Sequence, residues 1–468
     1  MRRRLLLLPT LLFSFATLAD AQSPSLTPTQ ALARDIFREL IGIDTTDEHG
    51  ATTPAADALA RRLREAGLPA ADVQVLGPTP RKANLVARLR GTGAKRPLLL
   101  LAHLDVVEAR REDWTVDPFT LLERDGFFYG RGAEDVKDGA AIMTANIIQF
   151  IKEGYRPDRD LILALTADEE GGTSNGVQWL LAEHRDLIDA ELCLNFDGGD
   201  FEALGTRRVS GAIQAAEKGY ADFTLEVTDA GGHSSLPRPG NTIYRLSAGL
   251  LRIADFTFPV HLNEVTRSFF TRRASLESGQ RATDMREAGG DNPPAAALER
   301  LSSDMYYNAL LRTTCVATLL TAGHAANALP QRARANVNCR IVPGETEEEV
   351  RSTLVRVLND PTISVSHPTP RQNPASPLRP DVLAAVDRAT AAVYPGLPII
   401  PTMETGATDG RLLRGAGIPT YGISGVFLDD LDDRSHGRDE RVGVRDFYDG
   451  LAFNYHLIRA LGTVPAAP

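Results

Sequence analysis

The chain has 468 residues, of which 43% are hydrophobic, and its formal net charge is -10. This length predicts two domains with a large buried core. The excess of acidic residues argues against binding to nucleic acid.

The first 21 residues have the three sections of a secretory signal peptide. Arginines follow Met1, an apolar run extends from Leu5 to Leu18, and small residues around Ala21 suit cleavage. A retained membrane anchor is the alternative, but the run is short, is interrupted by Pro9 and is followed by polar residues. We therefore expect an exported chain, periplasmic or secreted, that begins at Gln22 and has no stable membrane span.

Helical and strand patterns alternate between residues 22 and 211. The predicted helices and strands cover 29–41, 53–66, 84–89, 98–103, 139–152, 161–167 and 191–195. This alternation predicts an α/β fold with a mostly parallel sheet flanked by helices. The pattern returns over 370–468, where we expect two helices (380–393 and 445–461) and a strand (419–422) that complete the same domain.

Residues 212–369 have a different character. Longer alternating strands over 221–228 and 333–342 combine with helical patterns over 241–254 and 346–358. We interpret this part as an inserted α+β domain that serves as a lid or a dimerisation domain. Its middle, 257–308, is polar and rich in arginine and glycine, and its pattern predicts no particular element.

Two of the three cysteines fall in the predicted insertion. Cys315 and Cys339 lie on alternating stretches placed symmetrically about residues 327–330, so antiparallel pairing would put them opposite each other. A cross-strand disulfide can form there in an oxidising compartment. We favour two buried free thiols, because most opposite pairs lack disulfide geometry.

Side chains suited to metal binding recur at strand ends or in turns: His103, Asp135, Glu170, Asp197 and His436. The carboxyl ends of parallel strands gather ligands at one edge of a sheet. Imidazole nitrogen and carboxylate oxygen suit zinc, although cobalt or manganese can replace it. We predict two zinc ions per chain, with Asp135 as the bridge and one imidazole and one further carboxylate on each ion. His103 and Asp197 are assigned to one ion, and Glu170 and His436 to the other.

Two further carboxylates fit supporting roles. Asp105 follows His103 by two residues, so on a strand its carboxylate projects to the same face and can fix the imidazole tautomer. Glu169 is adjacent to Glu170 and points elsewhere, which leaves it free to take a proton from an activated water and pass it to the leaving nitrogen. Each of these short patterns alone is common in proteins without a site. Together they place several carboxylates at strand ends, where they would repel one another without a cation.

Two other features do not favour a site. The acidic run from Asp429 to Asp433 lies near His436, and we expect a solvated loop without a metal role. Ser424 lacks the full glycine spacing of a nucleophile elbow, so the sequence does not favour a serine hydrolase.

The motifs resemble those of the co-catalytic zinc exopeptidase family that includes glutamate carboxypeptidase, carnosinase-like dipeptidases, aminoacylase, acetylornithine deacetylase and succinyl-diaminopimelate desuccinylase. The resemblance covers nearly the whole mature chain. It is carried by His103-x-Asp105, residues 130–137, Asp168-Glu169-Glu170-Gly171, Asp197-Gly198-Gly199, residues 231–235, residues 327–330 and Ser435-His436-Gly437.

The resemblance implies roles that the residues alone do not establish. It implies that Asp135 bridges two zinc ions and that the Asp135-Val136 peptide bond is cis. His233 would help to hold the oxyanion, and in many dimeric members the partner subunit supplies this histidine. Asn327 and Arg340 would bind the substrate carboxylate, and the backbone at Gly406 would line the same pocket. Residues 257–308 make the insertion longer than usual, similar to the carboxypeptidase and N-acyl-amino-acid hydrolase branch.

These observations predict an exported zinc hydrolase that cleaves an amide or peptide bond next to a free carboxylate by attack of a metal-bridged hydroxide. A carboxypeptidase, a dipeptidase and an N-acyl-amino-acid deacylase all fit, with a small peptide or N-acyl amino acid as substrate and a homodimer through the insertion. One alternative is a dinuclear zinc aminopeptidase, which would anchor a free amine. Another is a noncatalytic exported binding protein on the same fold.

Overall fold

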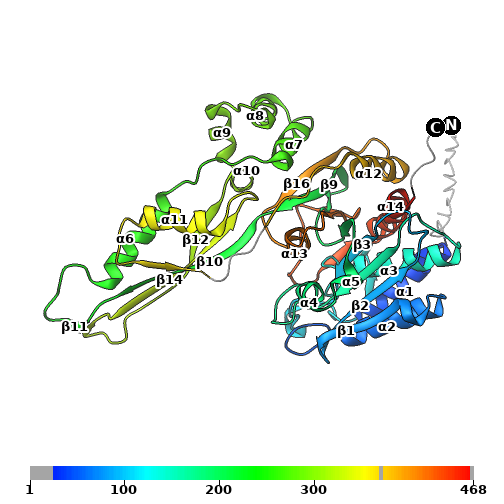
Figure 1. Cartoon of the computed structure of the whole chain (residues 1–468), viewed down its shortest axis with the longest axis horizontal. Helices are drawn as coiled ribbons and strands as arrows, with labels where there is room; N and C mark the ends of the chain where they lie inside the picture. Colours follow the sequence, from blue (N-terminus) through cyan, green and yellow to red (C-terminus); the bar gives the residue numbers. More distant parts are fainter. Residues whose placement is uncertain (1–24, 368–372, 464–468) are drawn as a thin grey trace, which may run out of the picture.

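The computed structural model describes residues 25–367 and 373–463, so the predicted signal peptide, residues 1–21, lies outside it. Figure 1 shows an elongated molecule, with a helix-flanked sheet at one end and a smaller sheet extending away from it. None of the helices described is both long and apolar enough to cross a membrane.

The main sheet has ten strands among the described residues, with β16 attached to β9 beside the path β1-β2-β6-β3-β7-β17-β9-β8-β18. Its centre, β6-β3-β7-β17, is parallel. The strands are β1 (Val73–Thr79), β2 (Lys82–Leu89), β3 (Leu98–His103), β6 (Leu161–Thr166), β7 (Leu192–Asn195), β8 (Phe201–Leu204), β9 (Arg207–Glu217), β16 (Ile399–Glu404), β17 (Thr420–Gly422) and β18 (Phe427–Asp429). A separate three-stranded sheet contains β4 (Leu122–Arg124), β5 (Phe127–Tyr129) and β19 (Arg441–Gly443).

Helices cover both faces of the main sheet, which explains why its central strands are continuously apolar. Along β3, Leu98 and Leu100 pack into one buried cluster, whereas Leu99 and Leu101 pack into another. The first cluster includes α1 (Pro28–Ile41), α2 (Thr53–Glu65), α3 (Lys137–Lys152), α12 (Pro380–Val393) and α14 (Val444–Gly462). The second includes α4 (Gly176–Glu183), α5 (Arg185–Ile188) and α13 (Gly410–Gly415).

The predicted fold class, a mostly parallel sheet flanked by helices, is confirmed. The predicted helices at 29–41, 53–66 and 380–393 agree closely with α1, α2 and α12. Helix α3 begins at Lys137, earlier than the predicted start at 139, because the glycine-rich turn before it leads directly into the helix.

The inserted domain is built on a second sheet of order β12-β14-β10-β15. Helices α6 and α11 pack on one face of this sheet and bury Phe223, Leu225 and Val337. Figure 1 shows the short β11–β13 ladder at the end of the domain away from the main sheet. The elements are β10 (Gly219–Thr228), β11 (Gly232–His233), α6 (Thr242–Asp255), β12 (Thr314–Ala322), β13 (Ala328–Leu329), β14 (Arg332–Ile341), α11 (Glu347–Leu358) and β15 (Ser364–Ser366).

The insertion begins later than the predicted boundary at residue 212. Strand β9 stays in the main sheet as far as Glu217, and β10 of the second sheet starts at Gly219. The side chain of Lys218 between them is buried and donates hydrogen bonds to Ala309 O, Arg312 O and Thr314 Oγ1 at 2.9–3.0 Å. The predicted end at residue 369 lies outside the described residues.

The segment at 257–308, for which the sequence predicted no element, forms most of a run of four helices. They are α7 (Glu264–Arg273), α8 (Gly279–Gly289), α9 (Ala295–Ser302) and α10 (Met305–Leu311). Phe270, Met285 and Leu310 are fully buried in the core of the main domain. Figure 1 shows α7 and α10 above the place where the inserted sheet joins β9 and β16, and their buried side chains assign this segment to the main domain.

Cys315 and Cys339 form a disulfide between β12 and β14, so our preference for two free thiols was wrong. The two residues are directly paired in the antiparallel ladder, with Cα atoms 4.1 Å apart. The symmetric spacing therefore predicted the pairing correctly, but strand register alone did not reveal how closely the two backbones approach.

Replacing both cysteines (Cys315→Ala with Cys339→Ala) should lower the free energy of unfolding of the inserted domain. The link closes a loop with a sequence separation of 24 residues, which corresponds to about 3.5 kcal/mol in the chain-entropy account. Denaturant unfolding followed by hydrogen exchange of β12 and β14 measures the change. Reductant should destabilise the wild type and leave the double variant unchanged; equal behaviour of the two proteins would contradict the assignment.

Candidate metal centre

The predicted metal ligands meet at the carboxyl edge of the parallel strands. His103 is the last residue of β3, while Glu170 and Asp197 lie in the turns that follow β6 and β7. Because these three strands are parallel neighbours, their carboxyl ends share one edge of the sheet. Asp135 arrives from the turn before α3, and His436 from the loop between β18 and β19.

The donor atoms of these residues form two groups that share Asp135. One group is His103, Asp135 and Asp197, and the other is Asp135, Glu170 and His436, with the ligand atoms of each group within 4.8 Å of one another. Each group offers one imidazole nitrogen and two carboxylates, a donor set that suits zinc. The residues therefore fit two ions with a shared carboxylate, in the grouping that the sequence predicted.

Asp135 faces an imidazole with each of its carboxylate oxygens. Its Oδ1 lies 3.0 Å from Nε2 of His103, and its Oδ2 lies 3.0 Å from Nε2 of His436. Burial alone would raise the pKa of Asp135, but hydrogen bonding and charge from the two histidines outweigh burial and lower it. The peptide bond from Asp135 to Val136 is cis, as the family resemblance implied.

His436 lies against two carboxylates. Its Nε2 is 2.9 Å from Oε2 of Glu170 and 3.0 Å from Oδ2 of Asp135. Hydrogen bonds to Asp135 and Glu170 raise the pKa of His436 to about 10. Among the protein groups alone the imidazole therefore holds a proton at neutral pH, and it must release that proton to bind a metal ion.

Asp105 supports His103 through its backbone more directly than through its carboxylate. Nδ1 of His103 lies 2.9 Å from the main-chain carbonyl oxygen of Asp105 but 3.7 Å from its Oδ1. The other carboxylate oxygen, Oδ2, accepts a hydrogen bond of 3.0 Å from the amide of Glu170. Asp105 therefore links His103 on β3 to the turn after β6 that carries Glu170. The acceptor that fixes the tautomer of His103 is the main-chain carbonyl of Asp105, and not its carboxylate as predicted.

Glu169 lies beside the metal ligands in a setting that favours its protonated form. Burial, together with the negative charge of Asp197, raises the pKa of Glu169 well above its usual range. The turn that presents it depends on Asp168, which has a left-handed φ of 55°. Lys82 and the amide of Ser174 bind the two carboxylate oxygens of Asp168 and hold that conformation.

Sequence reasoning missed Glu440, which organises the Asp135 turn. Its buried carboxylate accepts hydrogen bonds from the amides of Gly132, Glu134 and Asp135 at 2.8–3.1 Å. It also pairs with Nη1 of Arg131 at 2.6 Å. Local sequence offers no signal for this role, because Glu440 is separated from the turn by about three hundred residues and stands beside other charged groups.

Arg131 connects the same turn to the His436 loop. Its Nη2 donates to the carbonyl of Gly437 at 2.9 Å, and its guanidinium lies 5.0 Å from the centre of the Trp114 ring. Arg131 belongs to the glycine-rich motif at residues 130–137, so the sequence placed Arg131 near the site. The sequence did not identify Glu440 as its partner. The Arg131–Glu440 pair therefore fixes the loops that carry Asp135 and His436.

The other predicted site residues lie in different places. His233 and Asn327 come together at the β11–β13 end of the insertion, where the amide of Ser234 donates to the Asn327 carbonyl at 3.0 Å. Arg340, on β14, lies over the ring of Tyr220 at 4.8 Å, near the start of β10. Gly406 lies in the loop after β16, and this loop is linked to the Asp197 turn through Asn195, which hydrogen-bonds to Thr408.

The structure therefore brings the five metal ligands, Asp105 and Glu169 together, and places the Gly406 loop at their border. It does not bring His233 or Asn327 of the same chain to the metal centre. Figure 1 shows β11 at the opposite end of the inserted domain from the main sheet.

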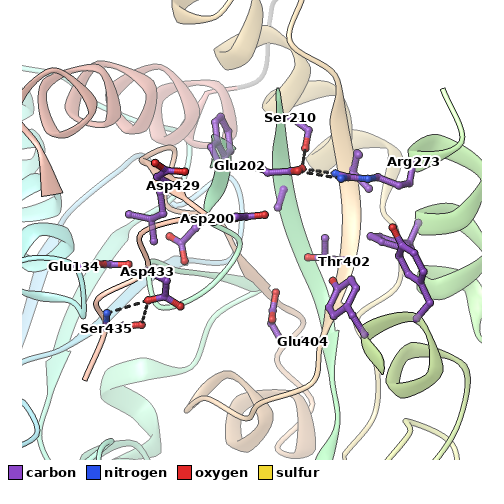
Figure 2. Close-up of a pocket in the computed structure, with 18 of the residues that line it drawn as sticks. Glu134, Asp200, Glu202, Ser210, Arg273, Thr402, Glu404, Asp429, Asp433 and Ser435 are labelled. Atoms are coloured by element: carbon purple, nitrogen blue, oxygen red, sulfur yellow. Dashed lines mark hydrogen bonds and ion pairs between the residues drawn. The ribbon is translucent and has the colours of Figure 1, made fainter. Parts of the chain in front are cut away.

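A cavity of ≈ 680 Å³ adjoins the metal centre. Figure 2 shows Glu134 and Ser435 in its lining, and these residues are the chain neighbours of Asp135 and His436. Asp429, Asp430 and Asp433 of the acidic run also line it.

Residues 99–460 match peptidase family M20/M25/M40. The chain belongs to this family. The match runs from β3 through the insertion to α14, and it confirms the resemblance that the sequence motifs indicated. Membership makes the protein a metallopeptidase or a related hydrolase.

The similarity to single members of the family is low in sequence identity. The chain is 29% identical over 356 residues to an N-fatty-acyl-amino acid synthase/hydrolase of Xenopus tropicalis, covering 74% of this chain and 69% of that protein. It is 27% identical over 386 residues to a probable carboxypeptidase S-like protein of Dictyostelium discoideum, covering 78% and 71%. The structure of a metallo-carboxypeptidase from Sulfolobus solfataricus shares the fold, with a TM-score of 0.69, 17% identity, and coverage of 91% and 98%.

Glu440→Gln should weaken metal binding in this family member by about 10- to 100-fold, as expected when a group that orients metal ligands is altered. Glutamine keeps the shape but puts an NH₂ group where backbone amides or Arg131 now donate. Metal affinity, measured by competition with a chromogenic chelator, tests this without an activity assay. Glu65→Gln, at an exposed position on α2, is the matched control. Unchanged affinity in Glu440→Gln would remove Glu440 from this role.

Proposed function

We propose that this M20/M25/M40 protein is an exported dinuclear zinc hydrolase that cleaves an amide or peptide bond next to a free carboxylate. A carboxypeptidase, a dipeptidase or an N-acyl-amino-acid deacylase fits this description. The observation that carries the proposal is the pair of donor groups that share Asp135, with Glu169 beside them. The names of the relatives, which include a carboxypeptidase and an N-acyl-amino acid hydrolase, support the substrate class.

The protein residues divide the chemical work. Bound zinc ions supply Lewis acidity toward a carbonyl group and lower the pKa of water. Bound cations beside Glu169 would favour its ionised form, and in that form it takes a proton from the attacking water and delivers it to the leaving nitrogen. The burial that raises its pKa makes this carboxylate a stronger base. Asp105 and Glu440 hold the ligands in place, so that the site needs little rearrangement during the reaction.

We assign recognition of the free carboxylate to Arg340, Asn327 and the backbone at Gly406. A guanidinium binds a carboxylate through two parallel hydrogen bonds, and an amide side chain can add another. Because Asn327 and His233 lie at the far end of the insertion, they would come from a second copy of the chain. His233 would then stabilise the oxyanion in the partner's site.

Exposed apolar groups on the insertion support a homodimer. Strand β12 is an edge strand on which Val316 is 60%, Leu319 68% and Leu320 56% exposed. On the neighbouring helix α6, Tyr244 and Leu251 are also exposed. Edge strands with apolar side chains favour pairing with another chain. The Cys315–Cys339 disulfide and the signal-like residues 1–21 together support export to an oxidising compartment, either the periplasm or the exterior.

A dinuclear aminopeptidase is the second candidate, since the metal centre itself does not select between an amine and a carboxylate on the substrate. Free, N-acylated and C-amidated dipeptides distinguish the two activities. The proposed enzyme hydrolyses the first two kinds and rejects the amidated ones, whereas an aminopeptidase hydrolyses amidated dipeptides and rejects acylated ones. A noncatalytic binding protein would hydrolyse none of them.

Glu169→Gln should retain the metal ions and lower kcat by a factor on the order of 10² to 10⁴, the usual contribution of a general acid–base. Elemental analysis and steady-state kinetics on N-acyl amino acids and dipeptides provide the two measurements. Glu183→Gln, at an exposed position of α4, should behave like the wild type. Near-normal kcat in Glu169→Gln would exclude Glu169 as the base.

His233→Ala should be inactive by itself, yet it should restore activity when mixed with Glu169→Gln. In a mixed dimer, one site combines the intact Glu169 of one chain with the intact His233 of the other. Random exchange of subunits should then give about one quarter of wild-type activity. Full activity of His233→Ala alone, or no recovery after verified subunit exchange, would contradict a shared site.

A further inference from the structure

The cavity beside the metal centre, which we call the acidic cavity, is formed by two parts of the main domain. Strands β8, β9 and β16 supply one side, through residues such as Ala212 and Ile400. Helices α7 and α10 supply the other, where Phe269, Tyr306 and Tyr307 present aromatic rings. The 257–308 segment thus provides a wall of a cavity that borders the reacting centre.

Charge in the acidic cavity is strongly one-sided. Its described lining contains eight carboxylates and one guanidinium, that of Arg273. The carboxylates belong to Glu134, Asp200, Glu202, Asp304, Glu404, Asp429, Asp430 and Asp433. Arg273 is already engaged, because its Nη2 donates to Oε1 of Glu202 at 3.0 Å. Burial raises the pKa of Glu134 to about 9, so this carboxyl group is neutral at pH 7. The other carboxyl groups still outnumber the one guanidinium, and the described lining has no uncommitted cation of its own.

Two polar groups in the lining are poorly stabilised by the protein itself, one by lack of a hydrogen-bond partner and the other by like charges. Thr402 on β16 is 8% exposed, and its Oγ1 has no hydrogen-bond partner among the described residues. Burial and the like charges of Asp200 and Glu217 raise the pKa of Glu404 to about 7. Figure 2 shows Thr402, Glu404 and Asp200 around the same cavity. A buried hydroxyl and a repelled carboxylate are both stabilised by a hydrogen-bonding cation.

The charge and spacing of the lining argue against two other occupants, a free carboxylate and a metal ion. A free carboxylate would be repelled by this lining, so the carboxylate end of the substrate must lie elsewhere. A metal ion needs at least three close donors, and in residues 25–367 and 373–463 the groups that meet this condition are the two centred on Asp135. The cavity carboxylates are too dispersed for one ion. An extended organic cation can contact several of them and also lie against the aromatic rings.

We propose that the acidic cavity binds a cationic group, such as a primary ammonium, on the acyl side of the scissile bond, away from the free carboxylate. This inference rests on the proposed function and narrows its substrate class to N-acyl amino acids or short peptides whose acyl part carries a positive charge. Thr402 and Glu404 accept hydrogen bonds from that group, and Asp200 adds a further negative charge.

Two synthetic substrates of nearly equal size test the proposal on the full-length mature protein. N-(6-aminohexanoyl)-leucine carries an ammonium group where N-heptanoyl-leucine carries a methyl group. The expected result is a kcat/KM at least about tenfold higher for the amino compound, in keeping with a charge-assisted hydrogen bond. The preference should fall as salt is raised. Equal values, or a preference for the heptanoyl compound, would overturn the proposal.

Variants of two lining residues test whether the preference for the amino compound arises in the acidic cavity. Glu404→Gln and Thr402→Val should each reduce the ratio of the two kcat/KM values, with the larger effect in Glu404→Gln, and should leave hydrolysis of N-heptanoyl-leucine nearly unchanged. Glu65→Gln, remote from the cavity on α2, should leave the ratio unaltered. A ratio that neither variant changes would place the cation elsewhere and overturn the assignment.

Failure of this proposal can be distinguished from failure of the proposed function. Hydrolysis of N-heptanoyl-leucine without a preference for the amino compound rejects the cation site and keeps the hydrolase. If neither compound is hydrolysed, calorimetric binding of the two acyl products, 6-aminohexanoate and heptanoate, to the metal-loaded protein still decides. Tighter binding of 6-aminohexanoate, lost in Glu404→Gln, supports the cavity, and equal binding rejects it.

Discussion

Carboxylates crowded at one buried edge of a sheet are the constraint on which the rest of this structure depends. Asp135, Glu170 and Asp197 meet there, with Asp105 and Glu169 directly behind them. Ionised carboxylates in such a setting repel one another and lose hydration, which raises their pKa values unless cations compensate. Two imidazoles offset only part of this charge. The negative charge that the imidazoles leave uncompensated is the physical reason to expect divalent ions, independently of any similarity to other proteins.

The surrounding structure holds these groups in place by hydrogen bonds from elsewhere. Glu440 gathers three backbone amides of the Asp135 turn, and Arg131 ties that turn to the His436 loop. Lys82 fixes Asp168, whose left-handed backbone forms the turn that carries Glu169 and Glu170. Apolar strands of the sheet set the positions of the ligands along the edge, whereas these buried ion pairs set their orientation. The metal centre therefore depends on residues from almost the whole length of the main domain.

The residues of the two donor groups could be predicted from sequence because each stands at the end of an apolar strand or in a turn that contains glycine, where local pattern and chemistry coincide. Glu440 could not be found in this way, since its partners are distant in sequence. The helices at 257–308 could not be predicted from sequence either, because α7 and α8 have weak apolar periodicity. These two helices are stabilised by the packing of Phe270 and Met285 in the main core. The Cys315–Cys339 bond depended on backbone spacing that strand register leaves undetermined.

The packing of the 257–308 helices against the main domain also shapes the cavity that we propose selects the substrate. Helices α7 and α10, which no local pattern predicted, supply one wall of the acidic cavity beside the metal centre. Helices α7 and α10 of the main domain line the acidic cavity, whereas the β11–β13 end of the insertion lies far from the metal centre (Figure 1). This geometry explains why a single chain holds the metal ligands but not the full set of expected substrate contacts.

Calorimetric titration of the metal-stripped protein with zinc, performed at pH 8 in two buffers of different ionisation enthalpy, tests the central claim most directly. The account predicts two ions per chain, corresponding to the two donor groups. It also predicts proton release, because His436, with a pKa of about 10, is protonated at this pH and binds zinc only after losing its proton. Binding should weaken as the pH falls. Fewer than two ions, or binding without proton release, would contradict the account.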